Sequence, residues 1–178
     1  MGYDEKIFKA KANIKARRLW LVFAILLTAN YGTDTANGAY SVSNYIIFVI
    51  LCWLPFVCGD ILLKKKGKDN DRYRLAFVIG YGIFYVFLLC TTTSPIAFTY
   101  ILPIISLIVI FKDEKFMIYC AVANMLSLIA SIAFHIFVLG QNTAIDHKNF
   151  QLQIACLLLC YIGYIMSVRH LTESDAAL

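Results

Sequence analysis

The side chains that could bind a ligand gather toward one end of the long apolar segments of this sequence. Phenol, carboxylate, imidazole and amide groups at one depth could line a small pocket with aromatic walls and one negative charge. The candidate ligand-binding residues are Tyr31, Asp34, Tyr45, Tyr100, His135 and Gln151. Because an imidazole can change its charge near neutral pH, His135 could also make such a pocket sensitive to pH. The competing interpretation is a belt of interfacial aromatic residues with ordinary hydrogen bonds between helices.

No set of residues in the sequence predicts catalysis. There is no glycine-rich phosphate loop, no HExxH motif and no nucleophile elbow. The cysteines lie in or beside apolar segments without a CxxC pair, which is typical of buried thiols. A metal site is the remaining alternative, but its candidate ligands show no recognisable spacing; they are Asp34, His135, Asp146 and His147. We therefore expect no enzyme activity, no catalytic residue, no cofactor and no bound metal.

The composition of the chain indicates that lipid is its solvent. Of the 178 residues, 61% are hydrophobic and only 15% are charged, and the mean hydropathy is +0.73. Soluble domains average about half apolar and about a quarter charged residues. The formal net charge is +5, but the cations flank apolar segments and form no stripe with base-stacking aromatics. We therefore expect the lipid bilayer as a partner and no nucleic acid.

The apolar segments predict an all-α, polytopic membrane protein with six transmembrane helices. These helices are expected at about residues 19–36, 42–63, 73–90, 96–111, 116–139 and 150–168. The basic stretch 63–74 cannot lie in lipid and strongly resists crossing it, so it marks a cytoplasmic loop. Placing both termini in the cytoplasm then leaves only Lys148, of 16 lysines and arginines, on the outer side. This asymmetry predicts a multi-pass protein of the cell (plasma) membrane, with cytoplasmic N- and C-termini.

Three parts follow from this topology. Residues 1–18 form a basic juxtamembrane cytoplasmic segment, which either lies along the headgroups or extends the first helix. Residues 19–168 form the six-helix transmembrane domain, and residues 169–178 begin a cytoplasmic helical output segment. Within the second helix, Pro55 predicts a kink, and Asp60 is expected to pair with Lys64 one turn later. Glycines 80 and 82 predict close helix packing and do not indicate an ion-selectivity filter.

Several stretches of the sequence resemble the N-terminal membrane region of a group of bacterial methyl-accepting chemotaxis proteins. They are Ile14-Lys15-Ala16-Arg17-Arg18-Leu19-Trp20, Gly80-Tyr81-Gly82-Ile83-Phe84-Tyr85, Thr93-Ser94-Pro95, Phe98-Thr99-Tyr100-Ile101-Leu102-Pro103 and Cys160-Tyr161-Ile162-Gly163-Tyr164. The resemblance implies a receptor without a large sensor domain outside the membrane. It also implies a homodimer coupled to a cytoplasmic kinase through an adaptor, by a region that is absent from this chain.

Two functions remain open from the sequence. The first is a membrane-embedded sensor and anchor module of a chemoreceptor-like signal transducer, which passes a stimulus through the sixth helix to cytoplasmic signalling helices. The alternative is a small transporter or channel subunit. Transporters built from inverted repeats often carry broken helices at matching positions of their halves. Here Pro55 and Pro103 fall in the second and fourth helices, which do not correspond.

Overall fold

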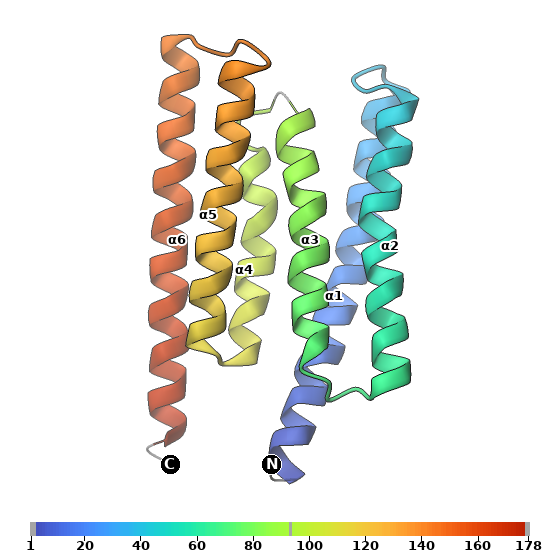
Figure 1. Ribbon diagram of the computed structural model, residues 1–178, viewed down its shortest axis with the longest axis vertical. Coiled ribbons are helices and arrows are strands. Elements are labelled where there is room, and N and C mark those ends of the chain that lie inside the picture. Colours follow the sequence, from blue (N-terminus) through green and yellow to red (C-terminus); the bar gives the residue numbers. More distant parts are fainter. Residues whose placement is uncertain (1–2, 93, 177–178) are drawn as a thin grey trace. The chain divides into compact units, whose positions relative to one another are not determined.

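The structure is a computed structural model that describes residues 3–92 and 94–176. Over these residues it is all-helical, with 87% helix and no strands (Figure 1). The elements are α1 (Tyr3–Ala36), α2 (Val42–Lys66), α3 (Arg72–Thr91), η1 (Ala97–Ile101), α4 (Leu102–Ile108), η2 (Val109–Phe111), α5 (Glu114–Phe137) and α6 (Ala144–Ala176). Residue 93 of the predicted outer turn and the last two residues of the predicted output segment lie outside the described residues.

Four of the described helices, α2, α3, α5 and α6, are long and apolar enough to cross a membrane. Many of their large apolar side chains are exposed, among them Ile46 and Leu54 on α2 and Leu159 and Met166 on α6. Such a surface is unfavourable in water but matches a hydrocarbon solvent. The structure therefore fits a membrane protein, and these four helices are candidates for four of the six predicted spans.

The two remaining predicted spans differ from simple apolar helices. Helix α1 is long, but its first half is charged and its last turns carry Asn30, Tyr31 and Asp34. It includes the basic N-terminal segment without a break, so this segment extends the first helix. Residues 97–111 are apolar but short, and they form a 3-10 helix, a short α-helix and a second 3-10 helix. Pro103 lies in the first turn of α4. At this position the missing backbone N–H of proline has no partner to lose within the helix, so the proline is tolerated.

The chain divides into two compact units, Met1–Phe84 and Tyr85–Leu178, with the boundary inside α3. In the first unit α1 packs beside α2, and the N-terminal part of α3 packs on both through aromatic side chains. The Trp20 ring lies edge-on to Phe56 at 5.7 Å and to Phe77 at 5.0 Å between ring centroids. These edge-to-face contacts build the centre of this unit.

Close packing of α3 on α2 depends on Gly80. A Cβ atom on this glycine would lie 2.4 Å from Cβ of Pro55 and 3.1 Å from the Trp20 ring. A Cβ on Gly82 would meet nothing within 4 Å. The predicted role in helix packing is therefore confirmed for Gly80 and wrong for Gly82.

In the second unit α5 and α6 pack side by side along their length (Figure 1). Asn124 Nδ2 donates a hydrogen bond of 2.8 Å to the Tyr161 hydroxyl, and both residues are buried. The Tyr85 hydroxyl donates to the Phe98 carbonyl at 2.9 Å, which holds the segment before α4 against the end of α3. Because lipid offers no hydrogen-bond partner, polar side chains and carbonyl groups inside the unit must bond to one another.

The first prediction concerns Gly80. We expect Gly80→Ala to lower the free energy of unfolding by about 1–3 kcal/mol, because the added methyl group must displace Pro55 or Trp20. Gly82→Ala is the control and should leave stability unchanged or raise it by up to about 1 kcal/mol, since alanine favours a helix. Reversible unfolding in mixed detergent and SDS micelles measures both. Equal effects of the two substitutions would contradict the packing described here.

Candidate functional site

The structure places the predicted ligand-binding residues in two groups of three, one group in each unit. The first unit holds Tyr31, Asp34 and Tyr45, and the second holds Tyr100, His135 and Gln151. The two groups belong to different units, so a ligand site made of all six residues stays a prediction.

The group in the first unit is centred on an aromatic stack. The buried Tyr31 ring stacks on Tyr40 and on Phe48, with centroids 4.3 Å from each and rings 9° from parallel. Tyr45 lies parallel to Tyr31 at 6.4 Å. The Asp34 carbonyl accepts from the backbone N–H of residue 39 at 2.9 Å and so helps to end α1. This arrangement resembles the aromatic packing that the sequence offered as the competing interpretation.

The group in the second unit includes one residue that lines a cavity, His135. The cavity has a volume of about 90 Å³, and the end of α3, the turn before η1, α5 and the start of α6 all contribute to it. Its polar lining residues are Thr92, Ser94, Ser131, His135, Gln141, Asp146, Asn149 and Gln153. Tyr100 does not line it, and Gln151 is exposed on α6. Since a water molecule takes about 30 Å³ of liquid, the cavity suits a few waters or a similarly small polar ligand.

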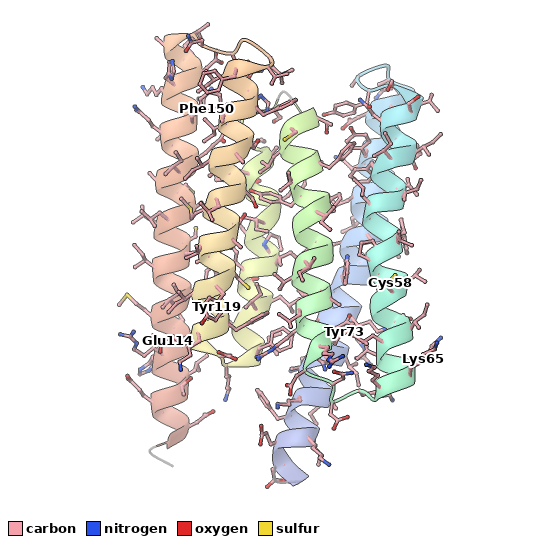
Figure 2. The ribbon with its side chains drawn as sticks, in the orientation of Figure 1. Cys58, Lys65, Tyr73, Glu114, Tyr119 and Phe150 are labelled. Atoms are coloured by element: carbon pink, nitrogen blue, oxygen red, sulfur yellow. The ribbon has the colours of Figure 1, made fainter. Side chains whose placement is uncertain are left out.

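His135 joins three elements around this cavity. It is only 7% exposed, and its Nε2 lies 2.7 Å from the Leu89 carbonyl oxygen. Because a carbonyl oxygen can only accept, Nε2 carries a proton and donates it. Nδ1 lies 2.9 Å from the side-chain amide of Gln141, and Phe150 packs 6.3 Å from the imidazole. Phe150 lies between α6 and α5, near the start of α6 (Figure 2).

Gln153 supplies the contact between α6 and the turn before η1. Its side-chain Nε2 donates a hydrogen bond of 2.9 Å to the Pro95 carbonyl, and the residue is 9% exposed. The start of α6 is fixed separately, because Asp146 accepts from the N–H of Thr143 at 2.9 Å and from its hydroxyl at 2.7 Å. The sequence places Gln153 near the same end of the last apolar segment as the other candidate residues. It does not show which face of α6 is buried.

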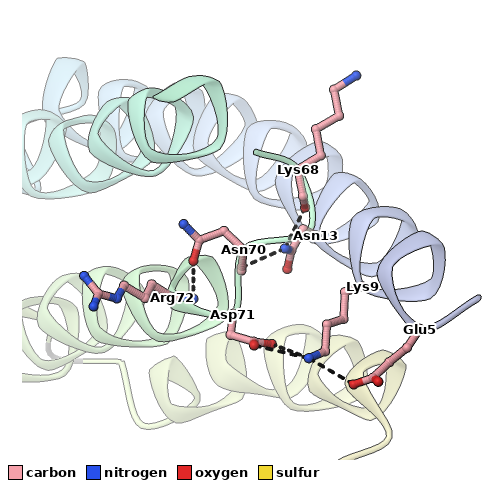
Figure 3. A network of polar contacts seen from close by, with 7 residues as sticks. All are labelled: Glu5, Lys9, Asn13, Lys68, Asn70, Asp71 and Arg72. Atoms are coloured by element: carbon pink, nitrogen blue, oxygen red, sulfur yellow. Dashed lines mark hydrogen bonds and ion pairs between the residues drawn. The ribbon is translucent and has the colours of Figure 1, made fainter. Parts of the chain in front are cut away.

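A second polar cluster lies in the first unit, where α1 meets the loop between α2 and α3 (Figure 3). The buried Asn13 donates from Nδ2 to the carbonyls of Lys68, at 2.9 Å, and Asn70, at 3.0 Å. The Lys9 ammonium lies 3.0 Å from Asp71 Oδ1 and 3.2 Å from Glu5 Oε1. The hydrogen bond to Asp71 raises the pKa of Lys9 above its ordinary value. Helix α1 therefore holds this loop in one conformation.

The expected pairing of Asp60 with Lys64 is wrong. Asp60 instead accepts two hydrogen bonds from the Arg17 guanidinium, one of them from Nη2 at 2.8 Å. The planar fork of arginine matches both carboxylate oxygens, which a lysine on the same helix cannot do. A sequence does not reveal this contact, because it depends on how α1 and α2 are rotated.

Two ion pairs tie the far end of α6 to the start of α5 in the second unit. Arg169 Nε donates to Glu114 Oε1 at 3.0 Å, and Lys112 pairs with Asp175. Lys112 adopts a left-handed conformation, with φ of 49°, that turns the chain from η2 into α5. These exposed pairs each contribute little to stability, but they link the two ends of the helices in the described structure.

No cluster of three or more histidine, cysteine, aspartate or glutamate side chains in the described part of the chain could hold a metal ion. Comparisons of the chain with protein-family models, with curated proteins and with solved structures find no match.

The second prediction concerns His135. We expect His135→Ala to lower the free energy of unfolding by about 1–3 kcal/mol, because the Leu89 carbonyl then loses its buried donor. Gln151→Ala, on the exposed face of α6, should change stability by less than about 0.5 kcal/mol. The measurement is unfolding in mixed micelles. A His135→Ala protein as stable as the Gln151→Ala protein would show that this hydrogen bond does not hold the cavity together.

Proposed function

We propose that this chain is a membrane-embedded sensor and anchor module that transmits a stimulus along its last helix. One observation carries the proposal: α6 is a single helix of 33 residues that contributes to both ends of the second unit. Its start supplies Asn149 and Gln153 to the cavity, and its end supplies Arg169 and Asp175 to the ion pairs with the α5 region. At about 1.5 Å per residue, the helix is about 50 Å long and exceeds the roughly 30 Å of bilayer hydrocarbon.

The mechanism follows from this continuity. A small polar ligand in the cavity, or a change in the bilayer, would favour one of two packings of α6 against α5. The Gln153–Pro95 and His135–Leu89 hydrogen bonds are the contacts that such a ligand would disturb. Because α6 is continuous, a small shift or rotation at its start reaches the Arg169–Glu114 pair at its end. Cytoplasmic signalling helices would receive that movement.

The proposed topology has six spans with both termini in the cytoplasm of a cell membrane. Besides the four candidate spans, α1 and residues 97–111 would each cross once. A 3-10 helix rises about 2.0 Å per residue, so the mixed helix over 97–111 reaches about 26 Å, close to the hydrocarbon thickness. The distribution of lysine and arginine supports this arrangement, because a four-span chain with the same cytoplasmic loop would leave the cations of α1 outside.

The proposed partners follow from the resemblance to chemotaxis receptors. They are a second copy of the chain and a cytoplasmic kinase that is reached through an adaptor. No nucleic acid, cofactor or catalysis is part of the proposal.

A small transporter or channel subunit is the second candidate, and one observation favours it. The two compact units, Met1–Phe84 and Tyr85–Leu178, are of similar length, as the halves of repeat-built transporters are. Their prolines do not match, since Pro55 lies inside α2 and Pro103 begins α4. Uptake of small polar solutes by proteoliposomes containing the purified chain would support this candidate over the sensor.

The third prediction tests transmission along α6 without a known ligand. A spin label at His170→Cys, in a chain whose six native cysteines are replaced, reports on the exposed far end of the helix. We expect Gln153→Ala to change the mobility of this label in nanodiscs, because it removes the hydrogen bond to Pro95. Gln151→Ala alters the exposed face of the same helix and should leave the spectrum unchanged.

Two results would contradict the sensor mechanism. Spectra that are identical for Gln153→Ala and the parent protein would show that the cavity and the far end of α6 are not coupled. An equal change in both variants would show only that α6 loosens on any substitution.

A further inference from the structure

A basic cavity lies in the first unit, at the end of α2. Its volume of about 540 Å³ is within the range of roughly 300–1,000 Å³ that is usual for small-ligand sites. One wall comes from α1, the second from the last turns of α2, and the third from the loop that follows α2. No part of this cavity belongs to the site around His135, which lies in the other unit.

Positive charge dominates the lining of this cavity. Four cationic side chains face one carboxylate, and that carboxylate, Asp60, is already bound by the Arg17 guanidinium. The remaining cations are Arg18, Lys64 and Lys68. In the described part of the chain, none of these three side chains has a carboxylate within ion-pair distance. The cavity thus presents guanidinium and ammonium groups that form no salt bridge within the described residues, and such groups suit a phosphate.

Contacts within the first unit hold the walls of the cavity together without a ligand. Gly67 ends α2 with a φ of 93°, and Asn13 then holds the carbonyl of Lys68 at 2.9 Å. Figure 3 shows the Lys68 side chain pointing away from this hydrogen bond. The Arg17–Asp60 pair ties α1 to α2 beside it. Pre-organisation of this kind lowers the entropic cost of binding.

The position of the cavity along α2 favours a lipid over a soluble phosphate. Leu63 is buried at its edge, and Lys64 follows where the apolar run of α2 ends. A membrane-spanning α2 therefore brings the cavity to the level of the lipid headgroups. Ile14 adds an apolar lining, and the exposed side chains of Val57 and Ile61 lie one to two turns earlier on α2, at the depth of acyl chains.

We infer that this cavity binds the phosphate of an acidic phospholipid, with Arg18, Lys64 and Lys68 as its ligands. The guanidinium fork engages two phosphate oxygens, the two ammonium groups neutralise the remaining charge, and the acyl chains lie along α2. Glycerol phosphate and inorganic phosphate share the same charged group without the acyl chains. The inference depends on the insertion of α2 in a membrane and not on signalling by α6.

The test compares two triple variants of equal charge. The cavity variant removes the three cations proposed to bind phosphate, by Arg18→Gln, Lys64→Gln and Lys68→Gln. The matched variant removes three exposed cations outside the cavity, by Lys15→Gln, Lys65→Gln and Lys66→Gln. Lys65 points away from α1 and α2 in Figure 2. Native mass spectrometry of the detergent-purified chain, titrated with phosphatidylglycerol or phosphatidylcholine, gives the affinity of each lipid. Because all six side chains are exposed, both variants should fold, which circular dichroism checks.

We expect the parent chain to prefer phosphatidylglycerol over phosphatidylcholine, and the cavity variant to lose about tenfold or more of that affinity. The matched variant should stay within about twofold of the parent. Equal losses in the two variants would overturn the site and leave only a general attraction to acidic membranes. Competition by glycerol phosphate or inorganic phosphate at the concentration of the lipid would overturn the lipid as its ligand.

Discussion

The structure depends on one constraint, which is that lipid can neither hydrogen-bond a peptide group nor solvate a charge. A chain with this composition must close its backbone hydrogen bonds within each segment, so 87% of the described residues are helical. Helix ends are satisfied locally, as when the Ser41 hydroxyl accepts from the N–H of Asn44 and Asp113 accepts from that of Phe116. Charged side chains that cannot stay in hydrocarbon concentrate where the helices end.

The same constraint favours polar sites at the ends of the membrane-crossing helices, and both units have such sites. In the first unit the site is basic, because Arg17 and Arg18 in the middle of α1 meet the cations at the end of α2 and in the loop after it. In the second unit it is a small cavity, lined by an imidazole, amides and hydroxyl groups and by one carboxylate, Asp146, that caps α6. Helix α6 extends from this cavity to the ion pairs of Arg169 and Asp175, which is why we propose it as the output element.

Periodic and compositional features of the sequence were enough to predict the helical class and the four helices that are apolar enough to cross a membrane, because burial in lipid leaves a strong signal. Close packing at Gly80 was also predicted, since a glycine within an apolar helix often marks a close approach, but the same argument failed for Gly82 and did not identify Pro55 as the neighbour. The depth of a residue in the membrane, which is all that the sequence gives, could not show that Tyr31 and His135 belong to different units. It also could not show that Gln153 is buried while Gln151 is exposed. Those features, like the pairing of Asp60 with Arg17, depend on helix rotation and on contacts far apart in the chain.

The most direct test of this account is the side of the membrane on which each loop lies. In a chain without its native cysteines, Lys68→Cys, Lys115→Cys or Asn142→Cys is labelled in intact cells with a maleimide that cannot cross membranes. Six spans predict labelling at residue 142 alone, with residues 68 and 115 reached only after permeabilisation. Labelling at residue 115 and protection at 142 would show that only α2, α3, α5 and α6 cross. That result would contradict both the proposed topology and a cytoplasmic output from α6.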